Sequence, residues 1–549
     1  MSGAGAGGGP LPHRDSKWWG WGDPAIVPQL GREAEQMLAG ELGGLEPAAR
    51  PPSAEQVELP PPEPLPRAIA DLVGAEHVLN GHEDRLRHAA GKGYVDLVRI
   101  RSGRLEAAPD AVVLPGGASE VQELLRVCAA EGVAVVPFGG GTSVVGGVEP
   151  LRGAHGRLIS LDLGRLRDVS VDRRALTARL GAGLRGPEAE RALGAAGLTL
   201  GHFPQSFEYA TIGGFAATRS AGQASSGYGR FDALVTSVGL LAPAGEIETL
   251  ETPHSAAGPA LRELIVGSEG ALGVIPDVTV RVRPAPERRR YEAWFAESFA
   301  AGAEIVRTMA QDGVLPDVIR VSDEEETRVS LTLSGPGQTV RRLLERYLRL
   351  RGVGGGSLLV AGFEGGGEAV DRRRALAARQ LRAGGAVYIG QGAGRAWERG
   401  RYHGPYLRDT LLDGGALVET LETAHTWTRL IELHEAVGRA IRSALEEQGT
   451  PGVILCHLSH AYPDGASLYF TFIARARRGE EVAQWRAAKR AASEAIVAAG
   501  ATITHHHAIG RDHLPYMAAE VGEMGMEALR AIKERLDPAG VMNPGKLLP

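Results

Sequence analysis

The chain is poor in cysteine and carries little excess charge. Only two cysteines occur in 549 residues, Cys128 and Cys456, and each falls in an apolar pattern. We expect buried thiols rather than a disulfide, which favours a reducing compartment. The formal net charge of -6 is small for this length, and no basic block with interleaved aromatic residues occurs. The composition therefore argues against a nucleic-acid-binding protein.

Long hydrophobic runs are also missing. Residues 1–24 contain no apolar core of signal-peptide length, and no stretch reaches the roughly 18 apolar residues that a membrane-spanning helix needs. We expect a cytoplasmic protein, and the sequence leaves peripheral contact with a membrane surface open.

Glycine, in contrast, is abundant, with 76 residues, and its densest turn is PFGGGTSVVGG at residues 137–147. Gly139, Gly140 and Gly141 let the backbone adopt positive φ, and successive N–H groups in such a turn suit a phosphate. Val144 stands where a Rossmann fingerprint needs its third glycine, and no lysine follows as a Walker loop requires. A glycine-rich turn that binds nothing is the alternative.

Two further glycine-bearing stretches follow. Residues 202–230 show little periodicity, and an irregular loop of that length in a compact domain usually has a ligand. Residues 267–275 read GSEGALGVI and precede an alternating strand. A GxGxxG match also occurs at residues 181–186. We attribute it to the ordinary boundaries of a helix rather than to a nucleotide site, because Pro187 begins that helix and Gly197 ends it. Three glycine-rich turns in one α+β domain suit an extended dinucleotide better than a single phosphate.

The length predicts two or three domains. The patterns indicate an arm and Pro-rich connector at residues 1–66, a helical segment at 67–108, an α+β domain at 109–286, a second α+β domain at 287–504 and a C-terminal segment at 505–549. The second domain has arginine-rich amphipathic helices and no phosphate loop of its own.

The arm carries Trp18, Trp19 and Trp21. One hypothesis makes these tryptophans a lid or a membrane anchor. The alternative is that the arm docks by burying its indoles on the body of the protein.

A strand expected at residues 468–473 has Leu468, Phe470 and Phe472 on one face and Tyr469 on the other. If the phenylalanine face packs in a core, Tyr469 points away from it, potentially toward a cavity. A tyrosine packed at a domain seam with its hydroxyl satisfied is the alternative.

Three consecutive histidines occur at His505, His506 and His507. From a strand they cannot all face one ion, although His505 and His507 could, and His457 and His460 would face opposite sides. We therefore predict no metal here, and a metal site remains the alternative.

These stretches together resemble the vanillyl-alcohol-oxidase-type FAD-binding fold, through PFGGGTSVVGG, HFPQSFEYATIGGFAATRSAG, GSEGALGVI and the tail LDPAGVMNPGKLL. The resemblance implies an α+β protein: a two-subdomain FAD-binding domain at residues 109–286, an α+β cap or substrate domain at 287–504, and a histidine loop and C-terminal segment at 505–549 that return to the FAD domain. The implied cofactor-binding residues are Pro137, Phe138, Gly139, Gly140, Gly141, Thr142, Ser143, Gln205, Ser206, Phe207, Glu208, Tyr209, Ala210, Thr211, Thr218, Arg219, Ser220, Ala221, Glu269, Gly270, Ala271, Leu272, Gly273, Val274 and Ile275.

No histidine or cysteine lies in the PFGGGTS loop, where some relatives attach flavin covalently. We therefore expect FAD to be bound without a covalent link.

Within this fold the chain is most similar to the alkyldihydroxyacetonephosphate synthase family, the flavoenzymes that make the ether bond of ether lipids. The similarity rests on WWGWGDP, PDVIRVSD, PYLRD, SHAYPDGASLYFTF and HHHAIG. It implies that the catalytic residues are Tyr469, His505, His506, His507 and Arg320, and that Arg408 binds the substrate phosphate.

The implied reaction is redox-neutral. The acyl chain of acyl-dihydroxyacetone phosphate leaves as a carboxylate, and a fatty alcohol takes its place. By the same resemblance Tyr469 is the general acid/base, the histidines stabilise developing charge, and Arg408 clamps the phosphate. We expect these lipid substrates, no nucleic acid, and a homodimer.

Flavin-dependent hydroxy-acid dehydrogenases of the same fold are the competing family. They typically carry a Gly-Asp-Gly-Asn-x-His strand and a Glu-His-Gly turn that bind a metal, whereas the corresponding stretches here are SHAYPDGASLYF and HHHAIG. An FAD-linked oxidase or dehydrogenase of a 2-hydroxy acid or alcohol is therefore the alternative function.

Overall fold

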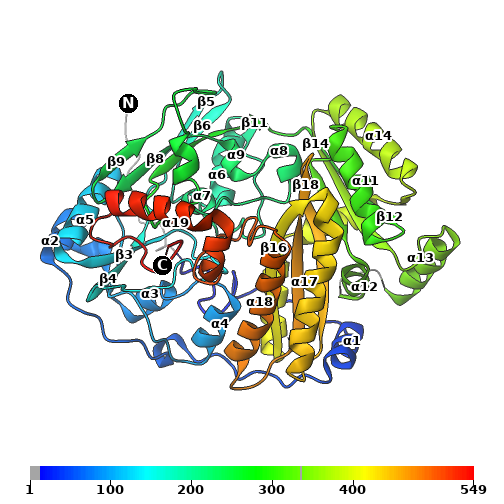
Figure 1. Cartoon of the computed structure of the whole chain (residues 1–549), viewed down its shortest axis with the longest axis horizontal. Coiled ribbons are helices and arrows are strands. Elements are labelled where there is room, and N and C mark those ends of the chain that lie inside the picture. Colours follow the sequence, from blue (N-terminus) through cyan, green and yellow to red (C-terminus); the bar gives the residue numbers. More distant parts are fainter. Residues whose placement is uncertain (1–12, 334–336, 549) are drawn as a thin grey trace.

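The structure is a computed structural model that describes residues 13–333 and 337–548. Two halves lie side by side in Figure 1: several small sheets with short helices form one half, and a single large sheet forms the other. Cys128 and Cys456 are both buried and unpaired, as expected from their apolar surroundings. Within the described ranges, no helix combines the length and the hydropathy needed to cross a bilayer.

The first half contains two main sheets. The four-stranded sheet has the order β1-β2-β4-β3, with β1 (Val78–Leu79), β2 (Ala111–Val113), β4 (Arg157–Asp162) and β3 (Val133–Phe138). The five-stranded sheet has the order β5-β6-β10-β8-β9, with β5 (Val169–Asp172), β6 (Thr177–Gly181), β10 (Asp277–Arg281), β8 (Val235–Ala242) and β9 (Gly245–Glu248). A short pair joins β7 (Leu198–Thr199) to β11 (Arg283–Pro284).

The helices of this half are α2 (Arg67–Val73), α3 (His82–Arg87), α4 (Tyr94–Arg101), α5 (Ala118–Glu131), α6 (Gly186–Ala195), α7 (Ile212–Ala217), α8 (Ser225–Tyr228), α9 (Phe231–Leu234) and α10 (Leu261–Ile265). The prediction of an irregular loop across residues 202–230 is wrong in part. Helices α7 and α8 lie within it, and with 6 and 4 residues they are too short to leave a periodic pattern.

The second half is built on a seven-stranded sheet of order β15-β12-β14-β13-β17-β18-β16. Its strands are β12 (Arg288–Ala296), β13 (Val318–Ser322), β14 (Ser357–Gly365), β15 (Val387–Gly390), β16 (Ala416–Thr426), β17 (Gly452–Ala461) and β18 (Gly465–Arg475). Its helices are α11 (Phe299–Gln311), α12 (Glu324–Leu333), α13 (Gln338–Leu350), α14 (Gly367–Ala383), α15 (Gln391–Gly400), α16 (Gly404–Asp413), α17 (Trp427–Glu447) and α18 (Glu481–Ala498).

The two faces of this sheet differ in what covers them. One face packs Leu468, Phe470 and Phe472 of β18 into the largest core cluster, together with the apolar stripe of α17. The opposite face is covered at one end by α1 (Arg32–Leu42), α12 and α16. Toward its other end the same face carries polar side chains, and these form the candidate site.

The C-terminal segment returns to the glycine-rich half, and the described part of the N-terminal arm lies against both halves. Helix α19 (Met517–Leu536) lies along the glycine-rich half in Figure 1, and Asn543 N donates to Val135 O of β3. At the other end, Trp18 and Trp21 are buried, which confirms that the arm docks on the body. Trp21 N donates to Asp409 Oδ2 at 2.6 Å, so the docked arm lies beside α16.

Candidate active site

Four neighbouring strands present one row of polar residues. Glu422 of β16 and His457 of β17 both pair directly with Tyr469 of β18, and Ser322 of β13 pairs with His457. Directly paired residues point to the same face of a sheet, and so do residues two apart on one strand. Arg320, His457, Tyr469 and Glu422 therefore share a face, opposite the phenylalanines, as the alternating pattern of β18 predicted for Tyr469.

The prediction that His457 and His460 face opposite sides is wrong. The register between β17 and β18 shifts between Leu458 and Ala461, where three steps along β17 match two along β18. This β-bulge adds one residue and reverses the alternation. The ring of His460 consequently lies 5.1 Å from that of His506, on the face where His457 stacks on Tyr469 at 4.9 Å.

The histidine loop is held by one carboxylate. Glu422 accepts hydrogen bonds from the backbone N–H groups of His505, His506 and His507, at 2.6, 3.0 and 2.8 Å. The Thr504 hydroxyl donates to it at 2.5 Å. Burial alone would raise the pKa of Glu422, but the imidazoles of His506, His507 and His505 outweigh it and hold the pKa well below its ordinary value. Glu422 is therefore a buried anion that fixes the loop.

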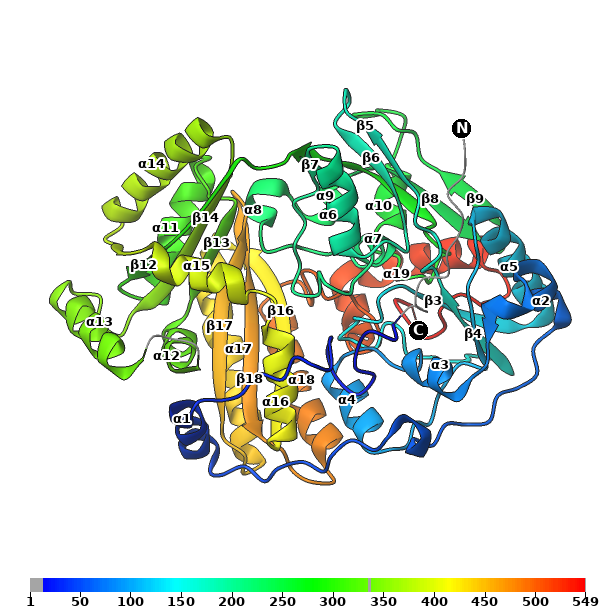
Figure 2. The ribbon, with the colours of Figure 1, turned by 180° about the vertical axis from the view of Figure 1, so that it is seen from behind.

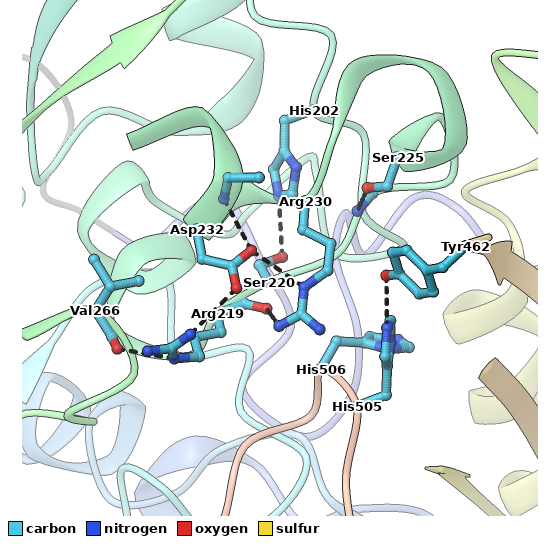
Figure 3. A network of polar contacts seen from close by, with 12 residues as sticks. His202, Arg219, Ser220, Ser225, Arg230, Asp232, Val266, Tyr462, His505 and His506 are labelled. Atoms are coloured by element: carbon cyan, nitrogen blue, oxygen red, sulfur yellow. Dashed lines mark hydrogen bonds and ion pairs between the residues drawn. The ribbon is translucent and has the colours of Figure 1, made fainter. Parts of the chain in front are cut away.

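His460, His505 and His507 are neutral imidazoles at neutral pH. Burial lowers the pKa of His507 to about 3 and lowers those of His505 and His460 well below the ordinary value. His505 Nε2 lies 2.8 Å from the Tyr462 hydroxyl (Figure 3). His507 Nδ1 is buried without a hydrogen-bond partner among the described residues. His505 and His507 can thus offer hydrogen bonds to a ligand without a resting positive charge.

Tyr469 lies at the centre of this arrangement. Its ring is 5.4 Å from that of His507, edge-on, and 6.1 Å from that of His506. Burial raises the pKa of Tyr469 to about 12, and Glu422 adds to the rise while Arg408 opposes it. The phenol of Tyr469 is therefore protonated before the reaction begins, so it can donate its proton but cannot accept one.

The guanidinium groups of Arg408 and Arg320 differ in how many of their N–H donors have a partner. The guanidinium of Arg320 is paired with Glu326, which also lies 3.2 Å from His457 Nδ1. Arg408 donates from one Nη to Lys92 O at 2.6 Å, but its Nε and its other Nη are buried without a hydrogen-bond partner. Buried donors of this kind are costly unless a ligand completes them. Arg408 therefore has the open fork that a phosphate needs.

The three glycine-rich stretches meet as the dinucleotide prediction requires. A Cβ added to Gly140 would lie 2.1 Å from Tyr209 O, and one on Gly139 would lie 2.2 Å from Thr211 Oγ1. A Cβ on Gly270, whose φ is +75°, would lie 2.9 Å from Pro137 Cγ. Stretches 137–143, 205–211 and 269–275 are thus in contact, and Ser268 Oγ and Asn543 Oδ1 are buried beside them without a partner. This cradle fits a bound FAD.

Two predicted cofactor residues have side chains occupied elsewhere. Arg219 donates to Val266 O at 3.0 Å and pairs with Asp232, so it braces the neighbouring turn (Figure 3). The Glu269 carboxylate accepts from Ile509 N and Gly510 N, at 2.8 and 2.7 Å. Glu269 thereby ties the third glycine turn to the segment that follows the histidines.

Sequence reasoning missed Glu422, Tyr462 and Arg230 as members of the site. Arg230 donates to Asp232 and to the backbone of Arg219, and Figure 3 shows it extending toward the side where Tyr462 meets His505. A signal for Glu422 exists, because it lies in a strand with buried-type apolar residues on both sides, and a buried carboxylate is rare unless it is paired.

The histidines that converge are not the pair considered from sequence. Ligand atoms of His460, His505 and His506 lie within 4.8 Å of one another. Strand alternation instead predicts that His505 and His507 face one ion. A second such group is His13, His88 and Asp162. In that group both imidazoles lie within hydrogen-bonding distance of Asp162 in β4, at 3.1 and 3.0 Å, and His13 thereby fastens the arm to this strand.

Residues 109–251 match the family model described as FAD binding domain, and residues 285–547 match the one described as FAD linked oxidases, C-terminal domain. A solved structure of p-cresol methylhydroxylase shares the fold, with a TM-score of 0.67 at 16% identity over 87% of this chain and 95% of that one. The chain is thus an FAD-binding protein with the two-domain architecture of the FAD-linked oxidases.

More similar relatives define the family. The alkyldihydroxyacetonephosphate synthase of Trypanosoma brucei brucei is 34% identical over 89% of this chain and 82% of its own. That of Dictyostelium discoideum is 32% identical, over 90% and 83%. A solved structure of an alkyldihydroxyacetonephosphate synthase is 29% identical, with a TM-score of 0.83 over 97% of this chain and 99% of that one. The chain belongs to the alkyldihydroxyacetonephosphate synthase family, as its motifs predicted.

Proposed function

We propose that this protein is an FAD-dependent, redox-neutral transferase that replaces the acyl chain of acyl-dihydroxyacetone phosphate by a fatty alcohol. The observation that carries the proposal is Arg408, a buried guanidinium with two unpartnered nitrogens on the side of Tyr469. Asp409 Oδ1 lies 3.8 Å from one of these nitrogens, too far for a hydrogen bond, so a phosphate or another anion in the substrate would supply the acceptors that they lack.

In this proposal the ester oxygen leaves with the acyl chain as a carboxylate. The oxygen of the fatty alcohol bonds to the same carbon, and the alcohol gives up its proton, so no net oxidation occurs. Arg408 holds the phosphate throughout, which keeps the reacting carbon in one place while the two chains exchange. Arg320, already oriented by Glu326, lines the same face of the sheet.

Tyr469 moves the carbon-bound proton. Its high pKa means that it donates readily only to a basic partner, and that after accepting a proton it returns to its stable form. The neutral histidines beside it donate hydrogen bonds to developing negative charge. If one of them becomes an imidazolium during the reaction, the Glu422 carboxylate stabilises it.

The cradle of residues 137–143, 205–211 and 269–275 would hold FAD, which when bound supplies the electron-poor ring system at which the substrate carbon reacts. We propose that it is held without a covalent link. Acid precipitation of the holoprotein tests this: the yellow colour should stay in the supernatant, and flavin in the pellet would contradict it.

The experiment for the main proposal supplies FAD-loaded protein with acyl-dihydroxyacetone phosphate and a labelled fatty alcohol. We expect labelled ether product and free carboxylate in equal amounts, with no electron acceptor required. Absence of exchange under these conditions would make the assignment wrong.

Oxidation of a 2-hydroxy acid or alcohol remains a second candidate, because His460, His505 and His506 converge as metal ligands could. Anaerobic bleaching of the flavin by a 2-hydroxy acid, dependent on an added divalent metal, would favour this candidate. We expect no bleaching, since hydrogen bonds to Tyr462 and within the loop already use the imidazoles of His505 and His506.

We further propose peripheral membrane contact through α13. Four apolar residues of this helix, Val340, Leu343, Tyr347 and Leu350, are 39–78% exposed and fall on one stripe at spacings of three and four. Arg342, Arg346 and Arg349 flank the stripe, as in helices that lie in an anionic membrane surface. In Figures 1 and 2, α13 stands at the outer edge of the molecule.

Flotation with anionic vesicles tests this contact. Leu343→Glu combined with Leu350→Glu should abolish flotation, whereas Leu250→Glu, at an equally exposed position in the other half, should not. Equal flotation of both variants would remove α13 as the contact. The expected homodimer is likewise a proposal, and light scattering of the holoprotein would test it.

A further inference from the structure

A pocket outside the row of site residues lies between α4, α18 and residues 511–516. Its volume is about 340 Å³, within the range of small-molecule sites, roughly 300–1,000 Å³. Val95, Val482 and Trp485 form apolar walls, and α4 and α18 lie side by side in Figure 1. The cationic lining is Arg99, Arg486, Lys489, Arg490 and Arg511. We call this the Lys489 pocket.

Lys489 is the unusual member of this pocket. Only 5% of it is exposed, and it makes no hydrogen bond or close ion pair with any residue that the structure describes, although its charge lowers the pKa of Asp512. Burying an ammonium without a partner is expensive. An anion in the pocket would complete it.

The acids in the lining do not cancel this positive charge. Burial raises the pKa of Asp96 to about 7, so this acid is partly protonated near neutral pH, and it raises that of Asp512 to about 6 against the charge of Lys489, which leaves Asp512 mostly ionised. The five cations of the lining still outnumber its three acids. Glu149 is the remaining acid, and it pairs with Arg99 and Arg511 at 2.8 and 2.6 Å. Arg486 has no ion pair among the described residues and is exposed at the rim.

We propose that the Lys489 pocket binds a phosphate monoester, at a site separate from Arg408. A single buried ammonium surrounded by guanidiniums suits a dianion, and lysine binds phosphate as a point charge. The rim arginines raise the local concentration of anions and so favour entry. The apolar walls accommodate a short carbon skeleton on the phosphate. The proposal is independent of the transferase assignment, because it concerns binding without turnover.

The experiment is calorimetric titration of FAD-loaded protein with glycerol 3-phosphate. Wild-type protein should show two sites, and Arg408→Met should retain one. Lys489→Met should lose the other, with affinity reduced about tenfold or more, the usual effect of losing a buried charged hydrogen bond. Because this substitution removes a buried charge and keeps the volume, the fold should persist.

Two further variants keep the test sharp. Arg486→Met, at the exposed rim, should weaken the same site about two- to threefold, and Arg442→Met, exposed on α17, should leave it unchanged. Two sites of unaltered affinity in Lys489→Met would overturn the proposal. A Lys489-dependent site that takes laurate but not glycerol 3-phosphate would also overturn it, since the ligand would then be a fatty carboxylate.

Discussion

The surroundings of Arg320 and of Arg408 contrast within one site. The Arg320 guanidinium is paired with Glu326, whose second carboxylate oxygen lies 3.2 Å from His457 Nδ1. Around Arg408 the guanidinium is buried with two nitrogens unsatisfied. A closed network holds geometry, whereas an open one awaits a ligand. The difference indicates that Arg320 shapes the site and that Arg408 binds in it.

The strongest test removes the hydroxyl group of Tyr469. Tyr469→Phe should lower kcat about 10²- to 10⁴-fold, the usual contribution of general acid–base catalysis. Substrate binding should change little, because Arg408 is intact. Steady-state kinetics with acyl-dihydroxyacetone phosphate would measure both, and a rise in KM without loss of kcat would contradict the assigned role.

Replacing each arginine in turn tests the contrast directly. Arg408→Met should raise KM for the phosphate substrate roughly 10- to 100-fold, since a charged hydrogen bond contributes about 1.5–3 kcal/mol. Arg320→Met should act mainly on kcat. Arg408→Lys is the matched control and should recover part of the binding through charge alone. Equal effects on KM at both positions would contradict the distinction between Arg320, which shapes the site, and Arg408, which binds the substrate.

Glu422→Gln probes the anion that anchors the histidine loop. At pH 7 we expect a loss of about 1–3 kcal/mol in the free energy of unfolding, because three N–H groups lose a charged acceptor. The pKa of Glu422 is depressed in the folded state, so its stabilisation is present above the unfolded pKa and is lost as pH falls through the folded one.

The gap between wild type and Glu422→Gln should therefore begin to close below about pH 4. Urea unfolding at several pH values would measure it. A gap that stays constant down to pH 3 would contradict a buried, ionised Glu422.

Removing the charge of Glu326 beside Arg320 should have the smallest effect on kcat. Glu326→Gln removes the carboxylate whose pKa lies at about 2 beside Arg320 and His457. We expect kcat to fall only about two- to fivefold, because the amide still accepts a hydrogen bond from Arg320. A loss as large as that of Tyr469→Phe would make Glu326 part of the chemistry.

Site residues could be predicted from the sequence where their position depends on the backbone, and not where it depends on contacts between distant segments. The glycine turns could be found because φ > 0 and close approach demand glycine, and the alternating strand placed Tyr469 on the correct face. Glu422 could not be assigned a role, since its three partners lie more than 80 residues away. The short helices α7 and α8 left no periodic trace. The expected domain boundaries remain predictions.

The extra residue in β17 has a consequence for how this site tolerates change in length. Because one additional residue between Leu458 and Ala461 brings His460 onto the face of Tyr469, deleting Ser459 would restore regular alternation and turn the imidazole toward the apolar helices. A single-codon deletion in this strand should therefore damage both the core and the histidine cluster, whereas substitution of Ser459 should be tolerated.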